Sequence, residues 1–496
     1  MPLRRNILVT FSYAIKNNMR KSWGVVKELL NRNRSSKFQT KFKLSNGLIV
    51  SNGTVISENF NNYFAEVGPT LAKSIPVQMK TPEEYLGPPL SNFILLSPVN
   101  DEEITKIIKS LNDSAPGQDE IRASILKISL PYIREPLIHV CNLSLLQGVF
   151  PEEMKTANII PLFKNDNSMM FNNYRPVSLL CVLSKVFENV MNKRLLELLN
   201  EFKLLYENQF GFRYEHSAYM ALMVLMDKML KSLENGEEVI GIFLDFSKAF
   251  DTVDHNILLK KLFHYGVRGT ALMWFESYLT NRTQFVTYNG VSSSLKAVKC
   301  GVHQGSILGP LLFLLYINDL HTACKHTLSI LFADDTNLFM SGRNMNEMME
   351  SINEELKHIS IWLKVNKLSL NIKKTQFMIF SKKRSKSDRP EISLKIDGQP
   401  ISETNQTKFL GVIIDNKLSW KEHVRHISGK VSKGIGIIIK LRPYLSQKAI
   451  KSMYYSFVYP YFTYCNHIWG CSSKTTLKRL HVLHKKSYTN SRSCKL

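Results

Sequence analysis

The sequence has no apolar run long enough to cross a lipid bilayer. Its longest candidate, ILGPLLFLLYI (residues 307–317), contains Gly and Pro and falls short of the roughly 18–20 residues that a membrane helix needs. Cysteine is also sparse: the seven cysteines are scattered, no CxxC pair occurs, and Cys465, His467 and Cys471 lack the spacing of a zinc site. We therefore expect no membrane partner, no zinc and a reducing intracellular compartment.

Acidic residues are scarce at both ends of the chain. The 496 residues include 65 Lys and Arg but only 41 Asp and Glu, a formal charge of +24. Glu28 is the only acid in residues 1–50, and no acid follows Glu422, although that last stretch contains the aromatic cluster MYYSFVYPYFTYCNHIW. Such an excess favours a polyanionic partner, nucleic acid before an anionic membrane surface. Aromatics among cations suit a phosphate backbone; a helical packing face with a solvated basic side is the alternative.

The hydrophobic content of 44% is ample for a large core with two or three subdomains. Residues 1–95 predict a basic helix followed by a loop-rich stretch. In residues 96–421, helical periodicity alternates with short β-rich apolar runs, which is typical of a mixed domain of helices and strands. Here residues 182–205 predict a long amphipathic helix, and EVIGIFLD (238–245) predicts a buried strand that ends in an acid.

Two neighbouring carboxylates, Asp334 and Asp335, stand between the apolar runs LSILF and TNLFM. Each run has the length and composition of a strand, and the ADDT between them is short enough for a hairpin turn. If these strands lie beside the strand that ends at Asp245, the acids converge, and divalent cations would relieve their repulsion. An ordinary exposed turn is the alternative, but it requires neither long apolar flanks nor a second strand-ending acid.

Oxygen ligands alone favour Mg²⁺ or Mn²⁺ over Zn²⁺. The usual task of a site with two such metals is phosphoryl or nucleotidyl transfer. The acid pair therefore predicts a metal-dependent enzyme that acts on phosphate esters.

Further motifs run in order along most of the chain. They are SAPGQDEI (114–121), GVFPEEMKTANIIPLFK (148–164), NNYRPVSLLCVLSKVFE (172–188), QFGFRYEHSAYMAL (209–222), IFLDFSKAFDTVDH (242–255), GVHQGSILGPLLFLLYINDL (301–320), FADD (332–335), WLKVNKLSLNIKKTQFMIF (362–380) and TKFLGVIIDNKLSW (407–420). Together they resemble the reverse transcriptases of non-LTR retrotransposons, most closely those of the jockey-like elements of animals. Phe332 and Ala333 before the acid pair favour this branch over viral RNA polymerases and retroviral enzymes.

The resemblance implies an α+β, right-hand polymerase fold with fingers, a palm containing an antiparallel sheet, and a partial helical thumb. Fingers and palm would span residues 96–421, with a core at about 155–415. Residues 1–95 would be a basic N-terminal helical or linker segment, and residues 422–496 a truncated thumb or C-terminal region. Relatives usually carry an endonuclease before the polymerase, so we expect a fragment that lacks it.

The implied function is RNA-directed DNA polymerisation, with an RNA template, a DNA primer or target, and dNTPs as partners. Asp245 and Asp334 would hold two Mg²⁺ ions, with Mn²⁺ as a possible substitute. Asp335 would support them, and the carbonyl of Phe246 would complete a coordination shell. Phe250 matches an aromatic gate that crowds the ribose 2′-hydroxyl, with core packing as the alternative.

Other motif positions resemble residues that bind the nucleotide or the primer. Lys164 and Arg175 match phosphate-binding residues of the fingers, and Gln304 and Gly305 match an element that packs on the nascent base pair. Lys374 matches a proposed general acid for pyrophosphate. The primer grip would consist of Phe409, Leu410 and Gly411, for which plain strand packing is the alternative.

The sequence departs from the family pattern at four positions, none of which is a metal ligand. His303 replaces a usual Pro, Glu120 a usual Gly, and Tyr214 and Glu215 replace small or basic residues. A decayed or domesticated nucleic-acid-binding remnant is the second interpretation, although the intact acids oppose it. An intron maturase-type enzyme is the third, but no splicing domain is visible.

Chromosomal integration would place the protein in the nucleus, after assembly on RNA in the cytoplasm. The run KKRSK (382–386) could serve nuclear import or be a solvated loop. Oligomeric state, template and integration site are left open.

Overall fold

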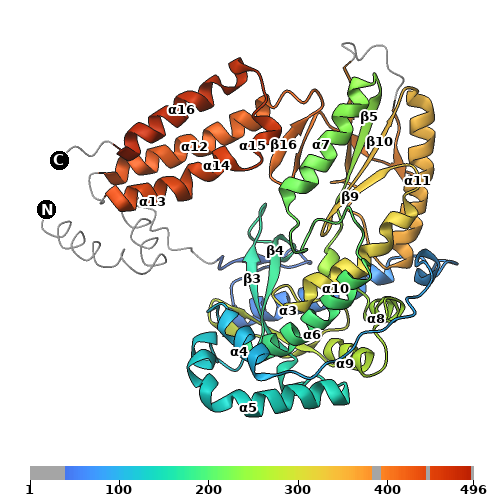
Figure 1. Ribbon diagram of the computed structural model, residues 1–496, viewed down its shortest axis with the longest axis vertical. Helices are drawn as coiled ribbons and strands as arrows, with labels where there is room; N and C mark the ends of the chain where they lie inside the picture. Colours follow the sequence, from blue (N-terminus) through green and yellow to red (C-terminus); the bar gives the residue numbers. More distant parts are fainter. Residues whose placement is uncertain (1–38, 383–391, 443–446, 493–496) are drawn as a thin grey trace, which may run out of the picture.

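A computed structural model describes residues 39–382, 392–442 and 447–492 (Figure 1). The basic helix expected near the N-terminus lies outside these residues, as does nearly all of the KKRSK run. In the part of the chain that is described, no helix is both long and apolar enough to span a bilayer.

A five-stranded sheet, in the order β14-β11-β5-β10-β9, lies between α7 (Ala218–Glu234) and α11 (Met345–Val365) in the upper right of Figure 1. We call it the central sheet because it carries the acid-bearing strands. Its strands are β5 (Glu238–Leu244), β9 (Leu328–Phe332), β10 (Asp335–Gly342), β11 (Gln376–Phe380) and β14 (Ser402–Glu403). β5 pairs antiparallel with both β10 and β11, and only β14 is parallel to its neighbour. The strands expected from the apolar runs are thus confirmed.

Both faces of this sheet are covered by apolar cores. On β5, Ile240 and Ile242 belong to the larger core, whereas Val239 belongs to a second core on the opposite face. Alternate residues of a strand point to opposite faces, which explains why β5 reads as a continuous apolar run. The larger core includes side chains of α6 (Val182–Glu201), α8 (His255–His264), α9 (Thr270–Leu279), α10 (Leu308–Ile317) and α11 (Met345–Val365). The second core includes α7 (Ala218–Glu234).

A second sheet lies next to this core, in the order β4-β3-β6-β7. It comprises β3 (Thr156–Phe163), β4 (Tyr174–Leu179), β6 (Thr283–Tyr288) and β7 (Val291–Ser292), with β8 (Lys296–Ala297) also paired to β6. α4 (Asp101–Ser110) and α5 (Ala123–Gln147) complete this part of the molecule, and β1 (Phe42–Lys43) pairs with β2 (Ile49–Val50). The chain is therefore a mixed helix-and-sheet structure, consistent with the expected α+β class. Its division into fingers, palm and thumb stays a prediction.

The expectation of a loop-rich stretch up to residue 95 is wrong for residues 53–73, which form the 21-residue helix α3 (Gly53–Lys73). Asn52 caps its first turn by accepting hydrogen bonds from the amides of Thr54 and Val55. Its buried face repeats every four residues at Ile56, Phe60 and Phe64. The polar run NFNN obscures this periodicity in the sequence.

The C-terminal region is a helical unit attached to the central sheet through a hairpin. Its helices are α12 (Lys421–Leu441), α13 (Gln447–Phe457), α14 (Tyr459–Thr463), α15 (Asn466–Trp469) and α16 (Lys474–Arg492). The hairpin consists of β15 (Gln406–Phe409) and β16 (Val412–Asp415), and it follows a shorter hairpin of β12 (Lys395–Ile396) and β13 (Gln399–Pro400). Figure 1 shows the orange and red helices projecting to one side of the sheet. The unit has its own core, which includes Val431, Ile438 and Ile450.

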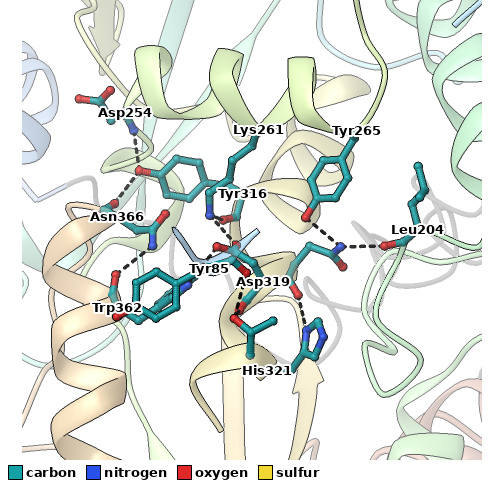
Figure 2. A network of polar contacts seen from close by, with 12 residues as sticks. Tyr85, Leu204, Asp254, Lys261, Tyr265, Tyr316, Asp319, His321, Trp362 and Asn366 are labelled. Carbon is teal, nitrogen blue, oxygen red and sulfur yellow. Dashed lines mark hydrogen bonds and ion pairs between the residues drawn. The ribbon is translucent and has the colours of Figure 1, made fainter. Parts of the chain in front are cut away.

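A buried polar network ties α8, α10 and α11 together (Figure 2). Nζ of Lys261 on α8 lies 2.5 Å from Oδ1 of Asp319 and donates to the carbonyl of Tyr316 at 2.6 Å. Nε1 of Trp362 on α11 donates to the other Asp319 oxygen at 3.1 Å. The Tyr316 hydroxyl in turn accepts from the amide of Asp254, the N-cap of α8, at 3.3 Å. The network thus fixes the start of α8 against α10 and α11.

Replacing Lys261 with methionine should destabilise the fold by about 3–5 kcal/mol, because Asp319 would be left charged, buried and uncompensated. The matched control is Lys260→Met. Lys260 pairs with Glu83 at 2.7 Å, but both side chains are largely exposed, so its loss should cost less than about 1 kcal/mol. Urea unfolding of the two variants measures the difference. If the two variants lose the same free energy of unfolding, the buried Lys261–Asp319 pair contributes no more to stability than the exposed pair.

His423 links the β15–β16 hairpin to α12. The amide of Ile413 donates to Nδ1 of His423 at 3.2 Å, and the ring packs edge-on against Trp469. Burial, aided by the nearby charge of His426, lowers the pKa of His423 to about 4. The folded protein therefore keeps this imidazole neutral at pH 5, whereas the unfolded chain would protonate it near pH 6.5.

Between these two pKa values the unfolded state binds a proton at His423 and the folded state does not. The contribution of His423 to the free energy of unfolding is therefore complete above about pH 7 and is lost as the pH falls toward 4. Between pH 7 and pH 5, we expect wild-type protein to lose about 2 kcal/mol more unfolding free energy than His423→Asn, which keeps an acceptor but does not titrate. Chemical unfolding at the two pH values measures this difference. Parallel pH dependence of the two proteins would contradict it.

Candidate active site

Asp245 lies directly after β5, at the end of the sheet where β10 begins. The last residue of β5, Leu244, pairs with Thr336 of β10. The Asp245 amide donates to Oγ1 of Thr375 at 3.3 Å, and its carbonyl accepts from the amide of Asn371 at 2.7 Å. The backbone at this acid is therefore held by the segment that precedes β11.

The acid pair lies in and beside the turn between β9 and β10. Phe332 pairs with Asp335, which leaves a two-residue turn of Ala333 and Asp334. The turn is thus shorter than the four residues expected, because Asp335 already belongs to β10. Continuing the β5–β10 register by one residue places Asp335 opposite Asp245. The expected adjacency of the two acid-bearing strands is confirmed.

The three carboxylates act on one another electrostatically. Burial, together with the charges of Asp334 and Asp245, raises the pKa of Asp335 to about 6. Burial also raises the pKa of Asp334; the charge of Asp245 adds to this rise, whereas those of Arg175 and Lys164 oppose it. Asp334 and Asp335 are nonetheless exposed to solvent, and Asp245 is half-buried. A concentration of carboxylates with raised pKa values and cations nearby is typical of a functional site.

Within the described ranges, no cluster of three or more His, Cys, Asp or Glu side chains is arranged to hold a metal ion. The two primary ligands expected from the resemblance, Asp245 and Asp334, need one backbone carbonyl in addition, that of Phe246. Phe246 forms an isolated antiparallel bridge with Leu370. The backbone hydrogen bonds of this bridge use the carbonyl of Asp245 and the amide of Ser247, so they do not occupy the carbonyl of Phe246. This all-oxygen donor set fits Mg²⁺ or Mn²⁺.

Two of the predicted basic residues act on the charge of these acids, and a third lies close to both of them. Lys164 directly follows β3, and Arg175 lies on the paired strand β4, opposite Leu162. Both side chains are exposed, and both act on the charge of Asp334. Lys374 is exposed in the turn before β11. Its charge, like those of Lys164 and Arg175, acts on Lys248.

Lys248 was not identified from the sequence. It lies between Asp245 and Phe250 with a left-handed φ of 53°, and burial, with the charges of Lys164, Arg175 and Lys374, lowers its pKa. Its Nζ lies 3.4 Å from the carbonyl of Tyr174 and over the Tyr63 ring. The only signal in the sequence was its place in the motif IFLDFSKAFDTVDH (242–255), which contains Asp245.

Phe250 is partly buried, with its ring stacked on Phe313 at a centroid distance of 4.2 Å and meeting Phe212 edge-on. One face of the ring therefore packs against the core. The structure is compatible with both interpretations of Phe250, the gate and core packing.

Gln304 donates from Nε2 to Oδ1 of Asp251 at 3.0 Å. Burial raises the pKa of Asp251 to about 6, against the lowering influences of Lys248 and of this hydrogen bond. Gly305 has a φ of 129°, and a Cβ there would lie 2.5 Å from the carbonyl oxygen of Ser178. Only glycine therefore allows this loop to pack on β4.

Two departures from the family pattern have visible structural consequences. Glu120 adopts a left-handed φ of 54°, a conformation that glycine would adopt without the roughly 1–2 kcal/mol penalty of a side chain. His303 is half-buried, with Nδ1 3.2 Å from the hydroxyl of Ser178. Tyr214 and Glu215 are exposed.

The residues expected to grip the primer form the tip of the β15–β16 hairpin. Phe409 is buried, and Leu410 and Gly411 make the turn with φ values of 44° and 86°. The hydroxyl of Tyr464 donates to the Leu410 carbonyl at 2.6 Å. A cleft of about 830 Å³ opens between this hairpin and the C-terminal helices, and its basic and aromatic lining includes Tyr219, Lys408, His426, Lys430, Tyr461 and His467.

Comparison with known proteins identifies the family. Residues 163–414, just over half of the chain, match the family model described as reverse transcriptase (RNA-dependent DNA polymerase). This range contains the acids, the basic residues that face them and most of the β15–β16 hairpin.

Two relatives from Drosophila melanogaster are each 30% identical to the chain. The RNA-directed DNA polymerase from mobile element jockey aligns over 82% of this chain and 45% of its own length. The probable RNA-directed DNA polymerase from transposon BS aligns over 83% and 47%. The chain thus spans about half the length of the curated relatives it matches, and it belongs to the reverse transcriptase family, as its motifs predicted.

Proposed function

We propose that this chain is an RNA-directed DNA polymerase of the non-LTR retrotransposon type, which adds deoxynucleotides to a primer 3′-hydroxyl. The observation that carries the proposal is the pairing of β5 with β10, which brings Asp245 to Asp334 and Asp335. Membership of the reverse transcriptase family supports it independently.

In this proposal the central sheet is the palm, the β3–β4 hairpin belongs to the fingers, and the C-terminal helices form the thumb. Asp245, Asp334 and the Phe246 carbonyl would hold divalent cations, with Asp335 adjacent. When bound, such cations activate the primer hydroxyl and neutralise charge on the departing pyrophosphate.

The remaining site residues would bind and orient the nucleotide. Lys164 and Arg175 face the acids from the β3–β4 hairpin, where they could bind the β- and γ-phosphates. Lys374 would donate a proton to pyrophosphate, and Phe250 would exclude a ribose 2′-hydroxyl. Gln304 and Gly305 would support the nascent base pair.

The primer would lie along the cleft beside the β15–β16 hairpin. Its lysine and histidine side chains can follow a phosphate backbone, and its tyrosines offer surfaces for stacking. An RNA template and a DNA primer or target are therefore the proposed partners. Integration into chromosomal DNA would place the protein in the nucleus.

Replacing Asp334 with asparagine should lower dTTP incorporation on poly(rA)/oligo(dT) with Mg²⁺ by more than about 100-fold, because even groups outside a metal's direct ligands are worth about 10–100-fold. Primer–template affinity should stay close to that of wild type. The matched control, Asp227→Asn, removes an exposed aspartate on α7 that pairs with Lys231, and it should retain full activity.

Two outcomes would contradict the assignment. Wild-type protein that binds primer–template in a salt-sensitive manner without incorporating nucleotide would be a noncatalytic binder. Incorporation that survives Asp334→Asn would instead remove Asp334 from the site.

Replacing Phe250 with valine should reduce discrimination between dTTP and UTP by at least about 10-fold, since about 1–3 kcal/mol of steric exclusion would be lost. The measurement is the ratio of kcat/KM for the two nucleotides. Loss of the stacking contact with Phe313 should also lower stability, which thermal unfolding records separately. A less stable variant with unchanged discrimination would assign Phe250 to core packing alone.

A further inference from the structure

The segment 208–211 extends the central sheet beside the acid-bearing turn, although the function proposed above assigns it no role. The amide of Leu331 on β9 donates to the carbonyl of Asn208 at 2.9 Å, and the amide of Phe210 donates back to Leu331 at 2.8 Å. Gln209 forms a parallel bridge with Leu331. β9 is the last strand of the sheet, so this segment covers its otherwise open edge.

The side chain of Gln209 reaches the turn itself. It is only 2% exposed, and its Oε1 accepts hydrogen bonds from the amide of Ala333 at 3.0 Å and from that of Gly211 at 2.9 Å. Ala333 is the residue directly before Asp334. The glutamine oxygen is therefore bonded to the backbone one residue from a proposed metal ligand.

The turn requires such support because of its own conformation. Ala333 has a φ of 55°, a left-handed value that is unfavourable for a residue with a side chain. Strained backbone of this kind persists where surrounding contacts enforce it. The bond from Ala333 to Gln209 is a contact of that kind.

Close packing at Gly211 leaves the turn little room to shift. A Cβ on Gly211 would lie 2.3 Å from the amide nitrogen of Ala333, so only glycine allows the two backbones to approach this closely. Glycine is required here for space and not for backbone conformation, because the φ of Gly211 is not positive.

The orientation of the Gln209 amide is fixed by its partners. Only its oxygen can accept from two N–H groups, and Nε2 is left buried with no hydrogen-bond partner among the described residues. A buried donor without a partner is unfavourable, so packing alone would be better served by an apolar side chain of similar size. The chemistry of the site therefore points to the acceptor oxygen as the needed feature.

We propose that Gln209 is a positioning residue of the active site, whose side-chain oxygen holds the Ala333 amide and thereby sets the place of Asp334. The inference rests on the proposed polymerase function. It concerns geometry alone: the buried Gln209 side chain would act through the Ala333 amide and not by direct contact with substrate or metal. Misplacement of a reacting group by about 1 Å can lower a rate about 100-fold.

Two substitutions separate the acceptor from the packing. Gln209→Met keeps the volume but removes the oxygen, and should lower kcat by about 10–100-fold with little change in the KM for dTTP or in primer–template affinity. Gln209→Glu keeps an acceptor oxygen and removes the unpartnered NH₂, and should retain more activity than Gln209→Met. A residue needed only for packing would give the opposite order.

A second readout does not depend on catalysis. Hydrogen exchange of a peptide covering residues 328–340 should be faster in Gln209→Met than in wild type, because the turn loses its external hydrogen bond. The matched control is Gln284→Met, which removes another buried glutamine whose Nε2 donates to Asn61 at the interface of α3 with β6. This control should leave both kcat and exchange of the 328–340 peptide unchanged.

The proposal is overturned if Gln209→Met has wild-type kcat, or if its 328–340 peptide exchanges like that of wild type. Failure of the underlying function looks different, because the wild-type protein itself would then show no Asp334-dependent incorporation.

Discussion

The antiparallel pairing of β5 with β10 is the constraint on which the rest of the structure depends. Seven consecutive residue pairs, from Thr336–Leu244 to Gly342–Glu238, set one register for the two strands. A shift by one residue would turn every side chain of a strand to the other face and separate the acids. Burial alone does not oppose such a shift, because β5 carries apolar residues on both faces. Shape does: the Phe339 ring packs over Gly241, where a Cβ would lie only 2.8 Å from it, so core packing and site geometry depend on the same register.

Charge is distributed around this register in a consistent way. The acids lie at one end of the sheet, and the β3–β4 hairpin brings Lys164 and Arg175 to face them. Lys248 is held among the same cations by the Tyr174 carbonyl, at the start of β4. Among the described residues the two sheets share no strand pairing, yet cations from one sheet act on the carboxylates of the other. The cleft beside the β15–β16 hairpin adds a further basic surface, which suits the phosphate-bearing ligands proposed above.

Much of the site could be predicted from the sequence because its signals are local. The apolar run of β5 ending in Asp245, and the acid pair between two strand-like runs, each stand out without knowledge of the fold. The exact turn could not be predicted, since the start of β10 at Asp335 depends on its pairing with Phe332. Helix α3 was missed because polar asparagines interrupt its apolar face.

Lys248 and Gln209 were missed for a different reason. Their importance arises from contacts with the Tyr174 carbonyl and the Ala333 amide, which are distant in sequence and involve backbone atoms. No periodicity or composition encodes a contact of this kind.

The separation of β5 and β10 along the chain has a consequence for biosynthesis. Roughly 90 residues intervene between them, and closing a loop of that length carries an entropic cost that only the completed pairing offsets. At translation rates of about 5–20 residues per second, Asp245 emerges from the ribosome several seconds before Asp334 and Asp335. During that interval the nascent protein has half of its site and a strand with unpaired edges, which is the kind of intermediate that chaperones bind.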